Sequence, residues 1–151
     1  MKSYTLIFVL SSAMLCSFII ISCKKSSQAP ATKYPSPTWQ TDTSSAYAYS
    51  MTAVIQLPDT LHEEIKDGDK LAAFVNDDCR GVGVIIKRDV QPDVFYILIK
   101  GSASEESKIK LKYYNASNSY MYATDDFLDF EVDKNYGTVD DPAKPNFQVV
   151  N

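Results

Sequence analysis

Residues 47–57 read YAYSMTAVIQL, and this stretch decides the fold class because two kinds of side chain alternate along it. Every second position is apolar or aromatic: Tyr47, Tyr49, Met51, Ala53, Ile55 and Leu57. The positions between them are mostly small or polar. A period of two is typical of a strand with one face in a core and the other toward solvent. Pro58-Asp59 ends this predicted strand.

Further strands are predicted downstream, separated by turn residues. They lie at residues 71–75, 79–87, 94–100, 108–113, 120–122 and 128–132, with a last edge at 147–150. Residues 71–75 are apolar on both faces, which favours a central strand, and Gly81 and Gly83 favour a bulge or a close backbone approach. No segment keeps a helical period over three turns. The pattern predicts an all-β, antiparallel β-sandwich of seven or eight strands, Ig-like or jelly-roll-like, with a barrel as the alternative.

The first 22 residues have the pattern of an export signal. Met1-Lys2-Ser3 provides one positive charge, and residues 4–22 are rich in apolar side chains and carry no charge. The segment ends in Ile20-Ile21-Ser22-Cys23, which resembles a lipobox, the motif of bacterial lipoprotein signal peptides. That resemblance implies cleavage before Cys23 and attachment of lipid to its thiol. An uncleaved membrane helix and plain secretion remain as alternatives.

Three parts of the chain follow from this interpretation. Residues 1–22 are the signal peptide, residues 23–38 are the lipidated cysteine and a flexible linker rich in proline and serine, and residues 39–151 are the β-sandwich domain. The membrane is then a partner through the lipid, at the inner or the outer membrane, with the domain in the periplasm or at the cell surface. Residues 24–28 carry no acidic side chain, which favours a site facing the periplasm. Cys79 has no cysteine left to pair with and is expected to be buried.

Several segments of the domain resemble a small β module of secreted and surface proteins in Bacteroidetes-type bacteria. They are YSMT (49–52), LAAFV (71–75), CRGV (79–82), FYILI (95–99) and IKLKYY (109–114). The similarity covers residues 39–150, and residues 74–81 carry most of it. The resemblance implies an all-β fold and an envelope location. It implies no enzyme activity, since none is assigned to that module.

Composition and motifs limit the chemistry that the domain can perform. The chain has 15 basic and 19 acidic side chains, a formal charge of −4, so no nucleic-acid partner is expected. His62 is the single histidine, and neither a phosphate-binding loop nor zinc-ligand spacing occurs. We therefore expect no cofactor, no metal and no catalysis. Two alternatives are a calcium site in the acidic turns (Asp67, Asp69, Asp77 and Asp78) and a glycosidase pair formed by Asp129 and Glu131, which more simply pair with the lysines of 108–112.

Three further features suggest sites. Tyr114 is expected on an exposed lysine-bearing face, where it could form a platform for a glycan or a peptide with Tyr120 or Tyr122. Arg80 is expected to point inward and form a structural ion pair, because an unpaired buried charge is costly. Asp59-Thr60-Leu61 resembles the short O-glycosylation acceptor motif of such bacteria, which marks Thr60. The predicted function is a non-catalytic binding module on a lipid anchor, and the alternative is a structural accessory subunit of a larger envelope assembly.

Overall fold

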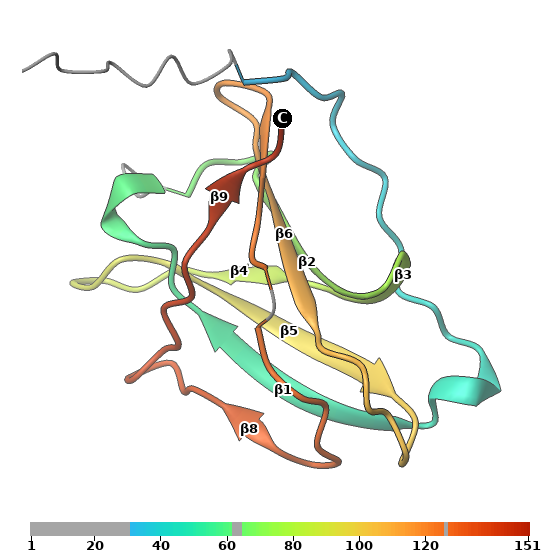
Figure 1. Ribbon diagram of the computed structural model, residues 1–151. Helices are drawn as coiled ribbons and strands as arrows, with labels where there is room; N and C mark the ends of the chain where they lie inside the picture. Colours follow the sequence, from blue (N-terminus) through green and yellow to red (C-terminus); the bar gives the residue numbers. More distant parts are fainter. Residues whose placement is uncertain (1–30, 62–64, 126) are drawn as a thin grey trace, which may run out of the picture.

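Two β-sheets face each other across one apolar core in the computed structural model, which describes residues 31–61, 65–125 and 127–151 (Figure 1). The four-stranded sheet has the order β4-β5-β1-β8 and the five-stranded sheet the order β3-β2-β6-β7-β9. The strands are β1 (Tyr49–Ile55), β2 (Lys70–Val75), β3 (Asp78–Val82), β4 (Val84–Ile86), β5 (Val94–Gly101), β6 (Lys110–Asn115), β7 (Tyr120–Ala123), β8 (Asn135–Tyr136) and β9 (Gln148–Val149). Two short 3₁₀ turns, η1 (Ser45–Tyr47) and η2 (Asp59–Leu61), flank β1. The predicted all-β sandwich is confirmed.

The details of the sheets differ from the expectation in the number and direction of the strands, at residues 79–87, which are divided between β3 and β4, and at residues 128–132. The described residues form nine strands, and the β1–β8 pair is parallel, whereas every other pair is antiparallel. The strand predicted at 128–132 is reduced to a single bridge between Ile109 and Leu128. Leu128 and Phe130 still point into the core, which explains why their alternation suggested a strand.

The alternation within residues 47–57 correctly identifies the buried face of β1. Met51, Ala53, Ile55 and Leu57 are at most 1% exposed. Tyr49 remains 47% exposed because it lies at the first position of the strand, beyond the edge of the core. Val54, on the opposite face, is also buried, and its carbonyl accepts a hydrogen bond from the Ala143 amide (2.9 Å).

One continuous segment crosses from one sheet to the other. β3 belongs to the five-stranded sheet and β4 to the four-stranded sheet, with Gly83 between them. At Gly81 the segment lies directly on β5, where an added Cβ would be 2.4 Å from the Leu98 carbonyl oxygen. Such crossings at a bend close one corner of a sandwich. Gly81 and Gly83 therefore have a structural cause, which is the close approach of two backbones.

Residues 33–42, which we call the N-terminal strap, lie on the outer face of the five-stranded sheet. Lys33 forms a β-bridge with Tyr120, and the Tyr34 amide donates to the Ser119 carbonyl (2.8 Å). Further along, the Trp39 ring packs edge-on against Phe74 with centroids 5.5 Å apart. The strap ends where the amide of residue 42 donates to the carbonyl of residue 79 (2.8 Å). In Figure 1 it is the blue-to-cyan segment that runs down toward β3.

The linker predicted to extend to residue 38 is therefore too long, because residues 33–38 belong to the folded domain. Ala31, Tyr34 and Pro37 are half-buried and the residues between them exposed, the three-residue spacing of a polyproline II segment. Pro35 and Pro37 favour this extended backbone. The composition suggested a solvated tether, but the apolar faces of these residues pack on the sheet instead.

Candidate functional site

The predicted tyrosine platform does not form. Tyr114 is only 5% exposed, so its expected exposure is wrong. Tyr114 lies beneath the strap, which contacts the sheet on both sides of it. On one side Lys33 pairs with β7, and on the other the ammonium of Lys70 in β2 donates to the Pro37 carbonyl (2.6 Å). Tyr114 lies opposite Met121 across the β6–β7 ladder. Residues directly opposite in an antiparallel pair share a face.

Tyr120 and Tyr122 consequently point away from the face that carries Tyr114. Tyr122 lies opposite Tyr113, and the two rings are 5.9 Å apart inside the sandwich. Tyr122 is half-buried, and its hydroxyl accepts a hydrogen bond from the Asn118 amide (3.3 Å). The three rings are therefore divided between two faces and offer no common surface to a ligand.

Arg80 has the carboxylate partner that a buried guanidinium requires. Its side chain is 5% exposed and forms an ion pair with Glu105 at 3.0 Å. The guanidinium carbon also lies 3.4 Å from the centre of the Tyr47 ring, in a cation–π contact. The pair joins β3, the loop before β6 and η1 at one end of the sandwich. Arg80 is thus held by three parts of the fold, as a structural residue would be.

The acidic turns differ in role, and Asp69 is the exception among them. Its carboxylate is 7% exposed and accepts hydrogen bonds from the Tyr113 hydroxyl (2.9 Å), the Lys66 amide (3.0 Å) and the Ala116 amide (2.8 Å). Burial, together with the neighbouring Asp69 charge, raises the pKa of Tyr113, which stays protonated as a donor. Asp69 therefore joins the turn before β2 to the turn after β6.

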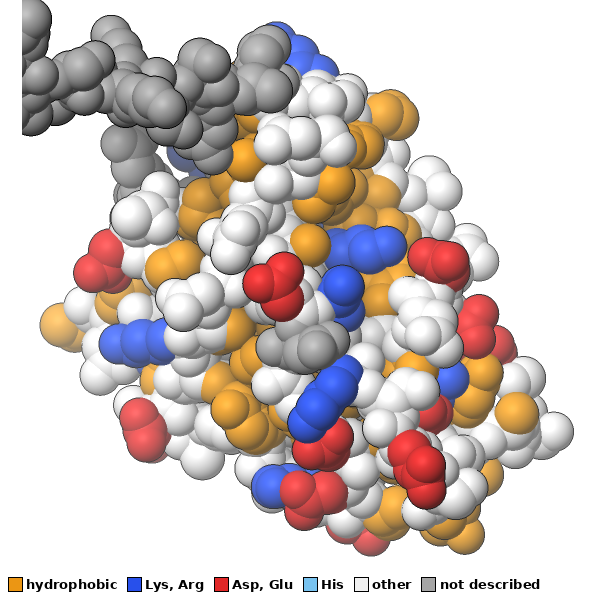
Figure 2. Space-filling model, viewed as in Figure 1, with side chains coloured by type: hydrophobic (Ala, Val, Ile, Leu, Met, Phe, Trp, Pro, Cys, Tyr) orange, Lys and Arg blue, Asp and Glu red, His pale blue; other side chains and the backbone are white. Residues whose placement is uncertain are grey.

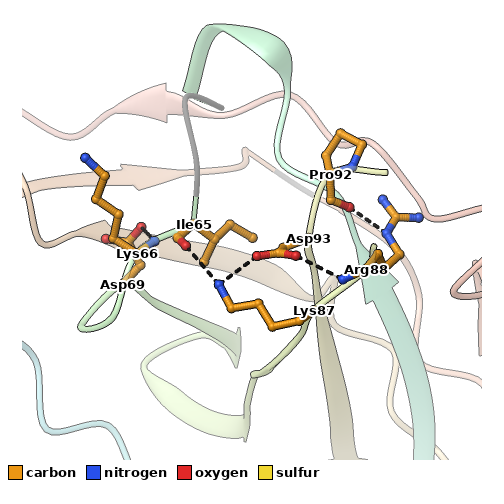
Figure 3. A network of polar contacts seen from close by, with 7 residues as sticks. All are labelled: Ile65, Lys66, Asp69, Lys87, Arg88, Pro92 and Asp93. Atoms are coloured by element: carbon orange, nitrogen blue, oxygen red, sulfur yellow. Dashed lines mark hydrogen bonds and ion pairs between the residues drawn. The ribbon is translucent and has the colours of Figure 1, made fainter. Parts of the chain in front are cut away.

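Figure 3 shows the contacts around the turn of Asp69 and the neighbouring β4–β5 turn. The Asp93 carboxylate accepts from the Lys87 ammonium (2.7 Å) and the Arg88 amide (3.1 Å), and the Lys87 ammonium also reaches the Ile65 carbonyl (3.4 Å). Partial burial opposes ionisation of Asp93, but these donors outweigh it and lower its pKa. The side chains of Lys87 and Arg88 are thus engaged by partners within the chain.

Replacing Asp69 with alanine should lower the free energy of unfolding by about 2 kcal/mol, because three donors lose their acceptor. Urea unfolding followed by tryptophan fluorescence measures the change. Asp67→Ala, two positions earlier and exposed, is the matched control and should shift stability by less than about 0.5 kcal/mol. Equal effects of the two substitutions would contradict the assigned role of Asp69.

The other acidic candidates are spread over separate parts of the described structure. Within the described ranges, no three acidic, histidine or cysteine side chains lie close enough to hold a metal ion. Asp129 pairs with Lys108 (2.7 Å), as predicted, and Glu131 pairs with Lys134 rather than with the lysines of β6. Asp77 is exposed in the turn between β2 and β3, and Asp78, the first residue of β3, is exposed and accepts a hydrogen bond from the Tyr47 hydroxyl (3.2 Å). His62 lies outside the described residues, as does Cys23.

Thr60 is exposed, as a modified residue must be, and Cys79 is partly buried, as a structural thiol can be. Thr60 is exposed in η2 and lines a shallow hollow with Lys66, Asn118 and Tyr122. Its modification stays a prediction. Cys79 is half-buried rather than fully in the core, and burial raises the pKa of its thiol.

A hollow of about 410 Å³ lies on the open flank of the sandwich, near the edges formed by β8 and β9. We call it the flank hollow, and its lining residues are Thr124, Asp125, Phe127, Tyr136, Lys144, Pro145, Asn146 and Gln148. Phe127 and Tyr136 meet edge to face, with ring centroids 5.0 Å apart and planes at 75°. Both rings are half-buried and pack against the core, which fixes them in place. The flank hollow combines aromatic walls with a polar rim, as ligand sites do.

Sequence reasoning missed the flank hollow because its residues come from three separate segments. Thr124, Asp125 and Phe127 follow β7, residue 136 lies in β8, and residues 144–148 lead into and begin β9. Each segment is short, and residues 140–146 look like a polar turn. The one available signal was the placement of Phe127 and Tyr136, two aromatic residues in stretches with little strand pattern.

Comparison of the chain with protein-family models, curated proteins and solved structures found no match to any of them. Among the residues that the structure describes, no helix is long and apolar enough to cross a membrane.

Proposed function

We propose that this chain is a non-catalytic binding lipoprotein of the cell envelope, anchored through lipid on Cys23, and that the flank hollow is its ligand site. The observation that carries the binding role is the hollow itself, in which an edge-to-face aromatic pair is surrounded by polar side chains. A concave site of a few hundred Å³ with a few convergent polar groups is the usual form of a small-ligand site. The ligand is a glycan or a protein segment.

The charged pairs elsewhere in the fold support a binding rather than a catalytic role. Asp129 and Glu131 each have a lysine partner, and the two pairs lie on the surface of the sandwich. Arg80 and Asp69 are occupied in holding loops together. These groups stabilise the scaffold, whereas the exposed polar side chains on the rim of the flank hollow are offered to a ligand.

The intact protein in detergent micelles, applied to a glycan array and to a displayed peptide library, tests the binding role. The double variant Asn146→Ala/Gln148→Ala should bind at least about tenfold more weakly than the parent, because two hydrogen bonds to the ligand are lost. Gln40→Ala, which removes an exposed amide from the strap, is the control and should bind like the parent. Unchanged binding by the double variant, or no binding by the parent to either library, would contradict the proposal.

A second candidate function, that of a structural accessory subunit, is favoured by the outer face of the four-stranded sheet. Val84 is 60% and Leu98 43% exposed there, and Tyr96 lies beside them in the β4–β5 ladder. If the flank hollow variants behave like the parent while Val84→Lys and Leu98→Lys release the protein from a larger envelope complex, the accessory role replaces the binding role.

A further inference from the structure

We infer that the flank hollow selects an uncharged, polyhydroxylated ligand, that is, a neutral sugar or short oligosaccharide. This inference rests on the proposed function, since it names the ligand class of the same site. It follows from the hydrogen-bonding groups, the aromatic walls, the charge balance of the hollow and the strand edge beside it.

The rim of the flank hollow offers side chains that have no partner elsewhere in the described part of the chain. Asp125, Lys144, Asn146 and Gln148 are exposed and make no side-chain hydrogen bond or ion pair with described residues. Thr124 differs, because its hydroxyl accepts from the Leu111 amide (2.9 Å) and is occupied. Asparagine and glutamine each present a donor and an acceptor, which is what a sugar hydroxyl, itself donor and acceptor, requires.

The aromatic pair provides the apolar contact that a sugar ring also needs. Because Phe127 and Tyr136 are perpendicular to each other, one ring turns its edge toward the face of the other. Both pack against the core on one side and line the hollow on the other. The negative face of an aromatic ring attracts the slightly positive C–H groups of an apolar surface. A sugar presents both such a C–H surface, which can contact the aromatic walls, and a rim of hydroxyls, which can contact the polar rim of the hollow.

The charge of the described lining favours a neutral ligand. It contains one acidic side chain, Asp125, and one basic side chain, Lys144. An anionic ligand would meet the carboxylate and a cationic one the ammonium, so the described lining has no excess of either sign. Figure 2 shows that acidic and basic side chains are interspersed over the face drawn, with neither gathered into a patch. Recognition of phosphate or sulfate would instead draw on clustered arginine or lysine.

The strand edge beside the hollow disfavours an extended peptide. A peptide that adds to a sheet needs a row of unpaired backbone groups along an edge strand. β9, the edge strand that contributes Gln148, is only two residues long. It is already paired with β7 along one side. A compact ligand held by side chains suits this site better than a strand held by backbone.

Isothermal titration of the intact protein tests the ligand class with three probes of matched length. They are neutral gluco-, manno- and galacto-oligosaccharides, oligosaccharides of uronic acids, and an extended uncharged peptide. We expect at least one neutral sugar to bind, with an affinity that changes less than about twofold between low and high salt, because no ion pair is made. Each of Asn146→Ala and Gln148→Ala should weaken that binding about three- to tenfold. Lys144→Gln, which removes the charge and keeps a donor, should change it less than about threefold.

The outcomes separate the ligand class from the binding role. Preference for the uronic acids, with loss of binding in Lys144→Gln or at high salt, would overturn the neutral-sugar inference and leave the flank hollow as the site. Preference for the peptide, still lost in the Asn146→Ala/Gln148→Ala variant, would do the same. Sugar binding that is unchanged in Asn146→Ala, in Gln148→Ala and in the double variant would overturn both proposals. Failure to bind any of the three probes or either library would also overturn both.

Discussion

Replacing Gly81 with alanine should lower the free energy of unfolding by about 3 kcal/mol or more, the largest stability loss that we expect from adding one methyl group to this protein. The new Cβ would lie 2.4 Å from the Leu98 carbonyl oxygen and 2.9 Å from the Ile97 Cγ2 atom. Both neighbours belong to β5, which pairs with β4 on one side and β1 on the other. A backbone atom in an interior strand cannot move aside without disturbing both ladders, so β3 must lift away from the sandwich.

Gly101→Ala is the matched control for this prediction. Its new Cβ would also collide with a neighbour, at 2.7 Å, but that neighbour is the ring of Phe130, which can turn. The expected loss is about 1 kcal/mol. Urea unfolding of both variants, with soluble yield recorded for each, measures the difference. A Gly81→Ala protein as stable as the parent would show that β3 does not lie against the β5 backbone.

The same crossing shows how far sequence reasoning could go with this fold. The series of short alternating strands predicted the sandwich, the apolar run at 71–75 predicted a central strand, and the glycines at 81 and 83 predicted a close backbone approach, because these are local signals. The partner of that approach, β5, lies about 17 residues away in sequence, and no local pattern identifies it. A carboxylate partner was expected for Arg80 because an unpaired buried charge is costly, but only the fold identifies that partner as Glu105.

The incorrect and missed predictions also have a common cause. Which distant segment covers a sheet face depends on the tertiary structure and not on the local sequence. Tyr114 follows the lysine face of β6 and was expected in solvent, yet the N-terminal strap covers that face. The strap itself resembled a linker by composition, since proline and serine give no strand or helix signal. The flank hollow is formed by segments that each look like turns. Features of this kind depend on which distant segment lies across a face, and that information is not local.

Replacing Cys23 with serine should move the protein from the membrane fraction to the soluble fraction almost completely, because a serine hydroxyl cannot form the thioether that carries the lipid. Stable anchoring needs about two acyl chains, and both depend on this one residue. Cell fractionation and labelling with a radioactive or clickable fatty acid measure the effect. Cys16→Ser, within the predicted signal peptide, is the control and should leave labelling and membrane attachment unchanged.

The strap adds a second readout to the Cys23 experiment. Cys23 and Lys33 are ten residues apart in sequence, a span of roughly 31 Å if extended at about 3.1 Å per residue. The lipid would thus hold the domain near the bilayer by the end that carries the β6–β7 turn, where Lys33 bridges Tyr120. Because none of the contacts described for the strap and the sandwich involves Cys23, the released Cys23→Ser protein should keep the parent's melting temperature and its ligand affinity. A Cys23→Ser protein that stays on the membrane, with no lipid label on the parent, would refute the anchor while leaving the sandwich and its flank hollow to be tested on their own.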